Sequence, residues 1–212
     1  MIGVFLHKYF RESLGRNLLN EEIKKNAHLL NGAILDVGSG SRRYDHYFKG
    51  QITAIDLIEN DQKKIFYGDI HALPFSDQTF DHVVCFEVLC YSNNVQKALK
   101  ELVRVSKQDA FILLSMPVFL RDSGDRVRLT KRYLEELLLE LNISRFEITE
   151  CGNAWTIMWD ILRTMILETR HLARKLSFYF LALPPLLIIL LFRLHKIQTP
   201  LYVAEHFILI KK

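Results

Sequence analysis

Cysteine is scarce in this sequence, which has three in 212 residues. Cys85, Cys90 and Cys151 are an odd number and lack the spacing of metal-ligand motifs. Two of them lie in or just after an apolar stretch that has the character of a strand. We therefore expect free thiols in a reducing compartment and no metal site.

A strong excess of charge is also missing, because 28 Lys and Arg stand against 24 Asp and Glu, for a net charge of +4. Proteins that bind nucleic acid usually concentrate far more positive charge on one face. We therefore expect no nucleic-acid partner. The apolar run at residues 1–6 is too short for a signal peptide, and charged residues follow it closely. The expected location is the cytoplasm.

The sequence has no uninterrupted apolar run of the length that spans a membrane, about 20 residues. The nearest candidate, residues 177–192, has no charged residue but contains Pro184 and Pro185 at its middle. Each half would rise only about 12 Å as a helix, against a hydrocarbon core of about 30 Å. We therefore expect no spanning hairpin. Basic residues flank this run on both sides: Arg170, Arg174, Lys175, Arg193 and Lys196.

Three interpretations of this apolar insertion remain open. It is a helix–turn–helix that dips into the membrane interface, with its basic flanks at anionic head groups. Alternatively, it covers an apolar substrate pocket or forms a homodimer face. The third interpretation is an ordinary buried helix. The first two favour a lipid-like, polyprenyl-linked or otherwise apolar ligand, and the first predicts peripheral contact of residues 177–192 with the inner face of the membrane.

Short apolar strands alternate with amphipathic helices along most of the chain. Because these strands are apolar on both faces, they predict a mainly parallel sheet covered by helices on each side. The predicted strands are residues 34–37, 52–57, 64–67, 82–86, 110–115, 145–151 and 202–210. The predicted helices are residues 5–14, 20–30 and 155–172, one capped by Asn93 or Asn94, and one capped by Thr130.

The length and the apolar content, half of all residues, are enough for one core of good size. We therefore predict a single domain over residues 1–212. It comprises N-terminal helices (1–31), a ligand-binding core (33–151), the apolar helical insertion (153–198) and the last strand (202–212).

The segment ILDVGSG, residues 34–40, joins a predicted buried strand to a turn that contains Gly38 and Gly40. The next strand ends in Asp56, twenty residues after Asp36. Open parallel sheets bind ligands beyond the carboxyl ends of their strands, and a carboxylate there suits the two hydroxyls of a ribose. The third glycine of the dinucleotide-binding pattern is missing, because Arg43 stands in its place. A nicotinamide or flavin site is therefore the weaker alternative.

Five motifs in order resemble those of class I S-adenosylmethionine-dependent methyltransferases, the broad group that methylates small molecules, lipids and glycans. They are ILDVGSG (34–40), AIDL (54–57), GDIHALPF (68–75), FDHVVCFEVLCY (80–91) and ELVRVSK (101–107). The resemblance implies a Rossmann-like α/β fold with a seven-stranded, mostly parallel sheet, helices on both faces and an antiparallel last strand. Here a helical apolar insertion precedes that strand. It also implies S-adenosylmethionine as cofactor and S-adenosylhomocysteine as product.

The resemblance further implies a role for each residue of the motifs. Asp36 and the Gly38-Ser39-Gly40 turn would hold the methionine end of the cofactor, and Asp56 would bind its ribose. Leu57 would lie beside the adenine, Asp69 would meet the adenine amino group, and the Ile70 amide would face a ring nitrogen. Phe86 and Glu87 would line the cofactor near its sulfonium.

One departure from the family concerns the acceptor side. The family often has Glu-His where this chain has Cys90-Tyr91, which removes one proton acceptor. His71, His82 and Glu87 lie near the predicted site, but a lone histidine there is more often structural, so we name no catalytic base. The predicted function is methyl transfer to a small, apolar or lipid-linked acceptor. The alternatives are another nucleotide-dependent Rossmann-type enzyme and a non-catalytic, cofactor-binding partner subunit.

Overall fold

The computed structural model describes residues 12–119, 124–168, 172–194, 197 and 203–212. The helix predicted at residues 5–14 therefore lies almost wholly outside the described residues. Contacts group the chain into two compact units. One unit comprises residues 1–21 and 150–205, and the other comprises residues 22–149 and 206–212. We describe each by itself, and the prediction of a single domain stays a prediction.

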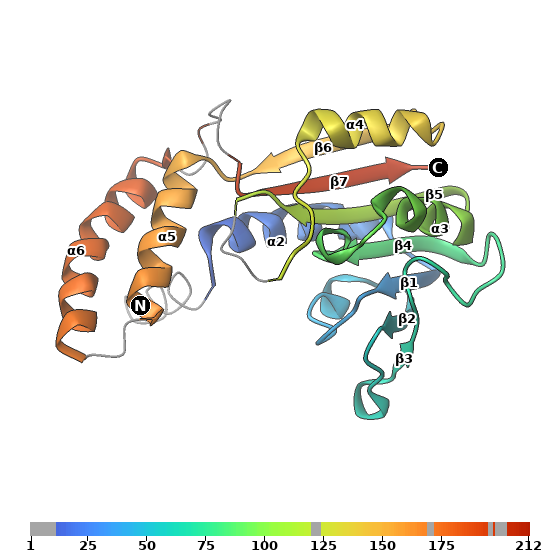
Figure 1. Cartoon of the computed structure of the whole chain (residues 1–212), viewed down its shortest axis with the longest axis horizontal. Coiled ribbons are helices and arrows are strands. Elements are labelled where there is room, and N and C mark those ends of the chain that lie inside the picture. Colours follow the sequence, from blue (N-terminus) through green and yellow to red (C-terminus); the bar gives the residue numbers. More distant parts are fainter. Residues whose placement is uncertain (1–11, 120–123, 169–171, 195–196, 198–202) are drawn as a thin grey trace. The chain divides into compact units, whose positions relative to one another are not determined.

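The larger unit is built on a seven-stranded sheet with the order β3-β2-β1-β4-β5-β7-β6 (Figure 1). Strands β1 to β5 are parallel where they pair. Hydrogen bonds from Lys212 to Ala110 and from Lys211 to Arg145 join the end of β7 to the starts of β5 and β6, so β7 runs antiparallel to both. The strands are Ala33–Val37 (β1), Gln51–Asp56 (β2), Ile65–Tyr67 (β3), Phe80–Phe86 (β4), Ser106–Pro117 (β5), Phe146–Cys151 (β6) and Glu205–Lys211 (β7).

Helices α3 (Val95–Val105) and α4 (Lys131–Glu140) cover one face of the sheet (Figure 1). Their apolar residues share a core with alternate residues of the strands, among them Leu35, Val83 and Ile112. Asn94 and Thr130 cap the two helices as predicted, each accepting a backbone N–H three residues on. The first strand pairs with both β2 and β4, so the strand order reverses at β1 and β4 and places a ligand site there.

Helix α2 (Leu14–Asn26) begins earlier than the predicted helix at residues 20–30, and it ends in a 3-10 turn. Its first turn belongs to the smaller unit. There the Asp160 carboxylate accepts the backbone N–H groups of Leu14 at 2.7 Å and Gly15 at 3.1 Å. The cap is therefore supplied from a distant part of the sequence, which explains why no local signal marks the start of this helix.

The smaller unit also holds the apolar insertion, folded as α5 (Ala154–Glu168) and α6 (Leu172–Leu191). The two helices pack through buried residues that include Trp159, Ile166 and Leu186. The Asn153 side chain accepts the backbone N–H groups of Trp155 and Thr156, and it donates to the carbonyls of Leu194 and Ile197. This asparagine ties the start of α5 to the segment that follows α6.

Of the three interpretations of residues 177–192, the helix–turn–helix is wrong, because α6 continues through Pro184 and Pro185. Proline has a φ near −65°, which a helix accommodates, and its cost is the lost hydrogen bond to the carbonyl four residues earlier. Packing against α5 compensates for this cost. None of the helices in the described residues is long and apolar enough to cross a membrane.

Candidate functional site

The glycine-containing turn after β1 is attached to the end of β2. The N–H groups of Gly38 and Ser39 both donate to the Ile55 carbonyl, at 2.8 and 3.0 Å. The Gly40 N–H donates to the Asp56 carboxylate at 3.0 Å, and the second Asp56 oxygen accepts from Ile58 at 3.2 Å. The two predicted halves of the site, which are twenty residues apart in sequence, therefore lie against each other.

Gly38 is required by close packing as well as by its backbone conformation. Its φ is +71°, and an added Cβ would lie 2.2 Å from the Val88 side chain, just beyond β4. Gly40 also has a positive φ, but an added Cβ there would meet nothing within 4 Å. The turn is thus closed on the side of β4 and open at Gly40.

Asp36 is a buried carboxylate at the end of β1, with a relative exposure of 6%. Burial, together with the nearby charge of Asp45, raises the pKa of the Asp36 carboxyl to about 7. The positive charge of Arg42 opposes that rise only in part, because the Arg42 guanidinium also bonds Asp45 at 2.6 Å. A cation that binds beside Asp36 would therefore stabilise the ionised form of its carboxyl.

The loop after β3 is the third part of the site. The Gly68 N–H donates to the Asp56 carbonyl at 2.9 Å, which joins this loop to the end of β2. One oxygen of Asp69, Oδ1, accepts the His71 N–H at 2.9 Å and lies 2.7 Å from the His71 ring. These contacts hold the pKa of the Asp69 carboxyl below its ordinary value. Ile70 is buried next to it.

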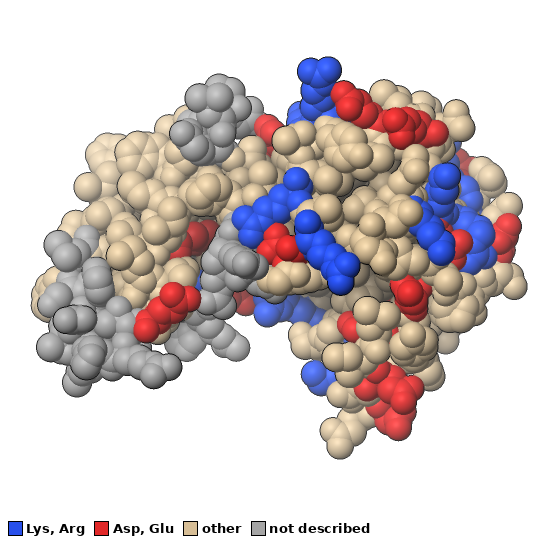
Figure 2. Space-filling view, in the orientation of Figure 1, with Lys and Arg blue, Asp and Glu red and all other residues tan. Residues whose placement is uncertain are grey.

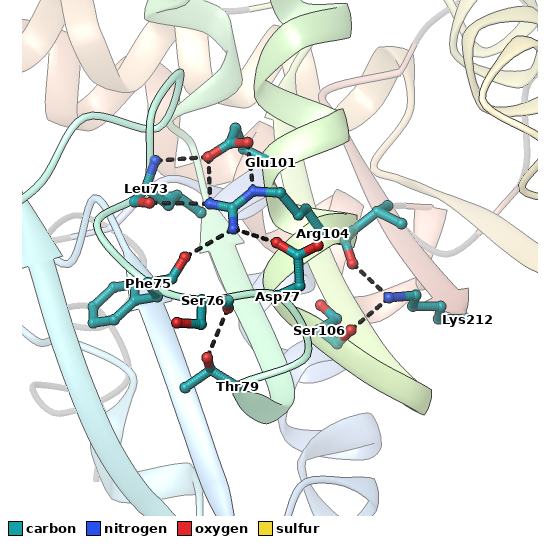
Figure 3. Close-up of polar contacts among 10 residues, drawn as sticks. Leu73, Phe75, Ser76, Asp77, Thr79, Glu101, Arg104, Ser106 and Lys212 are labelled. Carbon is teal, nitrogen blue, oxygen red and sulfur yellow. Dashed lines mark hydrogen bonds and ion pairs between the residues drawn. The ribbon is translucent and has the colours of Figure 1, made fainter.

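An ion-pair network fixes the end of this loop on helix α3 (Figure 3). The Arg104 guanidinium donates to the carbonyls of Leu73 at 3.0 Å and Phe75 at 2.8 Å, and it pairs with Glu101 and Asp77. Glu101 in turn accepts the Leu73 N–H at 2.8 Å. Hydrogen bonds and ion pairs therefore join the motifs GDIHALPF and ELVRVSK, a relation that the sequence alone did not reveal.

Strand β4 ends at Phe86, and Glu87 follows it directly at the same edge of the sheet. The Phe86 ring is buried against Tyr44 and Phe48, with ring centres 4.9 and 6.5 Å away. Glu87 has a φ of +60°, and its carboxylate accepts from the Ser115 hydroxyl at 2.8 Å. A non-glycine residue in this conformation is strained, and such strain concentrates at functional sites.

His82 does not belong to this site. It lies within β4, opposite Phe111 of β5, and its Nδ1 accepts the Phe111 N–H at 3.1 Å. Burial lowers the pKa of its ring. The sequence placed it near the ligand edge, and that expectation is wrong because His82 is near the start of the strand rather than its end.

The residues present fit S-adenosylmethionine. Asp36 provides a buried carboxylate for an ammonium group, and the nearby Ser39 Oγ and Asp45 Oδ1 are buried without a partner in the described part of the chain. Leu57 leaves 63% of its surface exposed next to Asp56, where an adenine ring would cover it. The space at Gly40 leaves room for a ligand to approach the backbone.

Comparisons with known proteins agree with this geometry. Residues 35–114 match the model of a methyltransferase domain. No curated protein sequence matches the chain.

Solved structures share the fold of this chain. A possible histamine N-methyltransferase from Thermotoga maritima superposes with a TM-score of 0.60 at 14% identity, covering 98% of this chain and 96% of its own. A methyltransferase from Aquifex aeolicus superposes with a TM-score of 0.51 at 23% identity, covering 62% of this chain and 82% of its own. The cyclase SpnF superposes with a TM-score of 0.60 at 17% identity, covering 92% of this chain and 79% of its own.

The domain match covers the strands and turns that build the site, and the fold extends the likeness to the rest of the described chain. S-adenosylmethionine is the cofactor that this domain uses. Residues 35–114 therefore form a methyltransferase domain, and the fold of the chain is that of S-adenosylmethionine-dependent methyltransferases.

Proposed function

We propose that this methyltransferase acts on an apolar or lipid-linked acceptor at a membrane surface. The observation that carries the proposal is the number of large apolar side chains that α5 and α6 expose. Soluble proteins rarely expose such side chains over a contiguous area, and larger patches mark contacts with membranes, ligands or partners.

Helix α6 is not amphipathic, because both of its faces are apolar. Ala182, Leu186 and Ile189 are buried against α5. Phe180 and Leu191, on the other hand, are 81% and 76% exposed, and Phe192 follows at 71%. A helix that is apolar all round is normally buried on every side. The exposed face therefore calls for an apolar environment.

Helix α5 repeats this pattern. Trp159 and Ile166 are buried, while a second row of apolar side chains is exposed: Trp155, Met158, Ile161 and Met165. In Figure 2 the described surface of the part that carries α5 and α6 shows little blue or red. Tryptophan is typical of the membrane–water interface, where its ring lies at the level of the head groups.

The charges that flank α6 in the sequence favour a membrane over an apolar protein partner. Residues 177–192 carry no charge, whereas five Lys and Arg lie within eight residues on either side of them. Basic residues beside an apolar helix attract anionic head groups by about 1 kcal/mol each. Within this set, Arg193 is exposed.

In this proposal the motif residues act as the family resemblance implies. Asp36 and the Gly38-Ser39-Gly40 turn hold the methionine end, Asp56 and Leu57 hold the ribose and adenine, and Asp69 with Ile70 reads the adenine edge. Phe86 and Glu87 lie at the sulfonium end, where Glu87 is held by Ser115.

S-adenosylmethionine supplies a methyl group on a positively charged sulfur. The protein's part is to align the acceptor with that methyl group and to exclude water, because the positive charge on sulfur disappears in the transition state. An acceptor that carries a lone pair without a proton needs no base. We therefore assign no residue the role of catalytic base.

Calorimetry tests the cofactor part of the proposal. We expect S-adenosylhomocysteine to bind at micromolar concentration and NAD to show no binding, because Arg43 replaces the third glycine of a dinucleotide site. Binding of NAD would favour another nucleotide-dependent enzyme. Because the cyclase SpnF has the same fold, turnover must be measured too, as release of S-adenosylhomocysteine with a panel of lipid and soluble acceptors.

Sedimentation with vesicles tests the membrane part. We expect the protein to co-sediment with phosphatidylglycerol vesicles, and the variant Leu191→Glu to bind about tenfold more weakly, since it places a charge among exposed apolar side chains. The matched control is Leu139→Glu on α4, where the side chain is 57% exposed and its neighbour is Glu140. That variant should bind vesicles like the unaltered protein.

Two results would contradict the membrane interpretation. One is an unaltered protein that stays in the supernatant with vesicles of any composition. The other is a dimer that Leu191→Glu converts to a monomer, which would identify this surface as a homodimer face instead.

A further inference from the structure

The imidazole of His71 joins two loops at the carboxyl edge of the sheet. Its Nδ1 lies 2.7 Å from Asp69 Oδ1, and its Nε2 lies 2.7 Å from Ser92 Oγ. Asp69 comes from the loop after β3, whereas Ser92 follows the short turn after β4. One side chain therefore connects segments that are more than twenty residues apart in sequence.

The chemistry of Asp69, His71 and Ser92 determines which group donates and which accepts in each of these hydrogen bonds. An ionised carboxylate only accepts, so the His71 proton must be on Nδ1. Nε2 then accepts, and the Ser92 hydroxyl donates to it. The Ser92 oxygen also accepts the Asn94 N–H at 3.0 Å, and the Asn94 side chain caps α3. Every member is thus held by its neighbour.

The order Asp, His, Ser is also that of a nucleophilic triad, but the structure argues against that role here. Ser92 is 4% exposed, and its oxygen already accepts the Asn94 N–H. The hydroxyl is therefore occupied as a link in the chain and is not presented to a substrate. A positioning role is the better account.

The effect on Asp69 is specific. Its side chain is 44% exposed, so without a support it would sample several rotamers in water. His71 holds Oδ1 twice, through its backbone N–H and its ring, which leaves Oδ2 for a ligand. We propose that His71 is a positioning residue that makes the cofactor site selective for a purine with an exocyclic amino group. This inference rests on the proposed role of Asp69 at the adenine.

The selectivity follows from charge. A fixed carboxylate oxygen accepts a hydrogen bond from the amino group of adenine, but it repels the carbonyl oxygen that hypoxanthine has at the same position. A mobile carboxylate makes a weaker hydrogen bond to the adenine amino group, and it can rotate away from the hypoxanthine carbonyl oxygen. Loss of His71 should therefore reduce the difference between the two ligands more than it reduces binding itself.

The test compares S-adenosylhomocysteine with S-inosylhomocysteine by calorimetry. We expect the unaltered protein to prefer the adenine ligand by about a hundredfold, which is near the upper end of what one hydrogen bond to a charged group contributes. His71→Ala should lower this ratio about tenfold, because it removes one hydrogen bond to a charged group. His71→Asn, which keeps an N–H donor, should recover part of the ratio.

Two further variants complete the design. Ser92→Ala leaves the Asp69 contact but frees the His71 ring, so we expect a smaller fall in the same ratio. His28→Ala is the matched control, because His28 is exposed and its ring bonds only the Lys25 carbonyl in its own turn. It should leave both affinities unchanged. Thermal melts of all variants report whether they fold.

The outcomes separate this inference from the proposed function. Equal losses for both ligands in a folded His71→Ala protein would overturn the inference, since a merely structural role lowers both alike. A ratio near one in the unaltered protein would also overturn it, with cofactor binding intact. An unaltered protein that binds neither ligand would overturn the proposed function and this inference together.

Discussion

Replacing Asp36 with asparagine is expected to stabilise the ligand-free protein by about 2–4 kcal/mol at pH 8 and to weaken S-adenosylhomocysteine binding about a hundredfold. The carboxylate is buried, and it lies close to Asp45 and Asp56. Ionisation in that environment costs free energy, which asparagine avoids. The ligand's ammonium group, however, needs the negative charge. Thermal melts and calorimetry measure the two effects.

The pH dependence of this effect follows from the direction of the shift. The pKa of Asp36 is about 7 in the folded protein, above the 3.8 of an unperturbed carboxyl. A raised pKa means that the folded state binds the proton more tightly than the unfolded state does. The contribution of protonated Asp36 to the free energy of unfolding is therefore fully present below about pH 4, and it is lost as the pH rises through 7. The gain in the free energy of unfolding from Asp36→Asn should therefore grow between about pH 4 and 7 and stay constant at higher pH.

Ligand affinity should change with pH in the opposite direction. If Asp36 holds the ligand's ammonium group as proposed, binding requires the ionised carboxylate, so the affinity should rise up to tenfold per pH unit below 7 and become constant above it. Asp36→Asn should abolish this dependence. The control is Asp61→Asn, an exposed carboxylate in the turn before β3. If Asp36→Asn melts at a lower temperature at pH 8, the carboxylate is stabilised by a partner in the ligand-free protein, contrary to this prediction.

Replacing Asp56 with alanine is expected to reduce S-adenosylhomocysteine affinity by about two to four orders of magnitude. Two hydrogen bonds from ribose hydroxyls to a carboxylate are lost, each with a value of about 1.5–3 kcal/mol. The Gly40 N–H also loses its acceptor at 3.0 Å, which loosens the turn at the methionine end. The change is largely at the surface, so we expect a melting temperature within a few degrees of the unaltered protein.

The matched control for this substitution is Asp61→Ala, which removes an exposed carboxylate from the turn that follows β2. It should leave the affinity unchanged. Asp56→Asn should fall between the two, because it keeps one acceptor for Gly40. A folded Asp56→Ala protein that binds the ligand normally would show that the ribose lies elsewhere, and the proposed orientation of the cofactor would have to be abandoned.

The sheet and the centre of the site were predictable from the sequence because their signals are local. Apolar runs that end in Asp36 and Asp56 mark two strands and their carboxyl ends, and the glycine turn stands directly after the first. The predicted strands agree with the observed ones to within a few residues at their ends, except that β5 begins earlier, at Ser106. The antiparallel last strand and the cofactor followed from the family resemblance rather than from periodicity.

What the sequence did not reveal depends on contacts between distant residues. The break expected at Pro184 did not occur, because packing on α5 outweighs the lost backbone hydrogen bonds. The start of α2 depends on Asp160, about 145 residues away. His71 was interpreted as an isolated histidine, and only the fold brings Ser92 to its second nitrogen.

The Arg104 network bears on how the enzyme exchanges its cofactor. Residues 73–75 are tied to α3 by a guanidinium that contacts two backbone carbonyls and two carboxylates at once. Any opening of the loop at residues 73–75 must either break those contacts together or move the end of α3 with it. If the cofactor binds against this loop as proposed, its release would involve the loop and α3 as one unit, and an arginine that need not touch the ligand would contribute to the barrier.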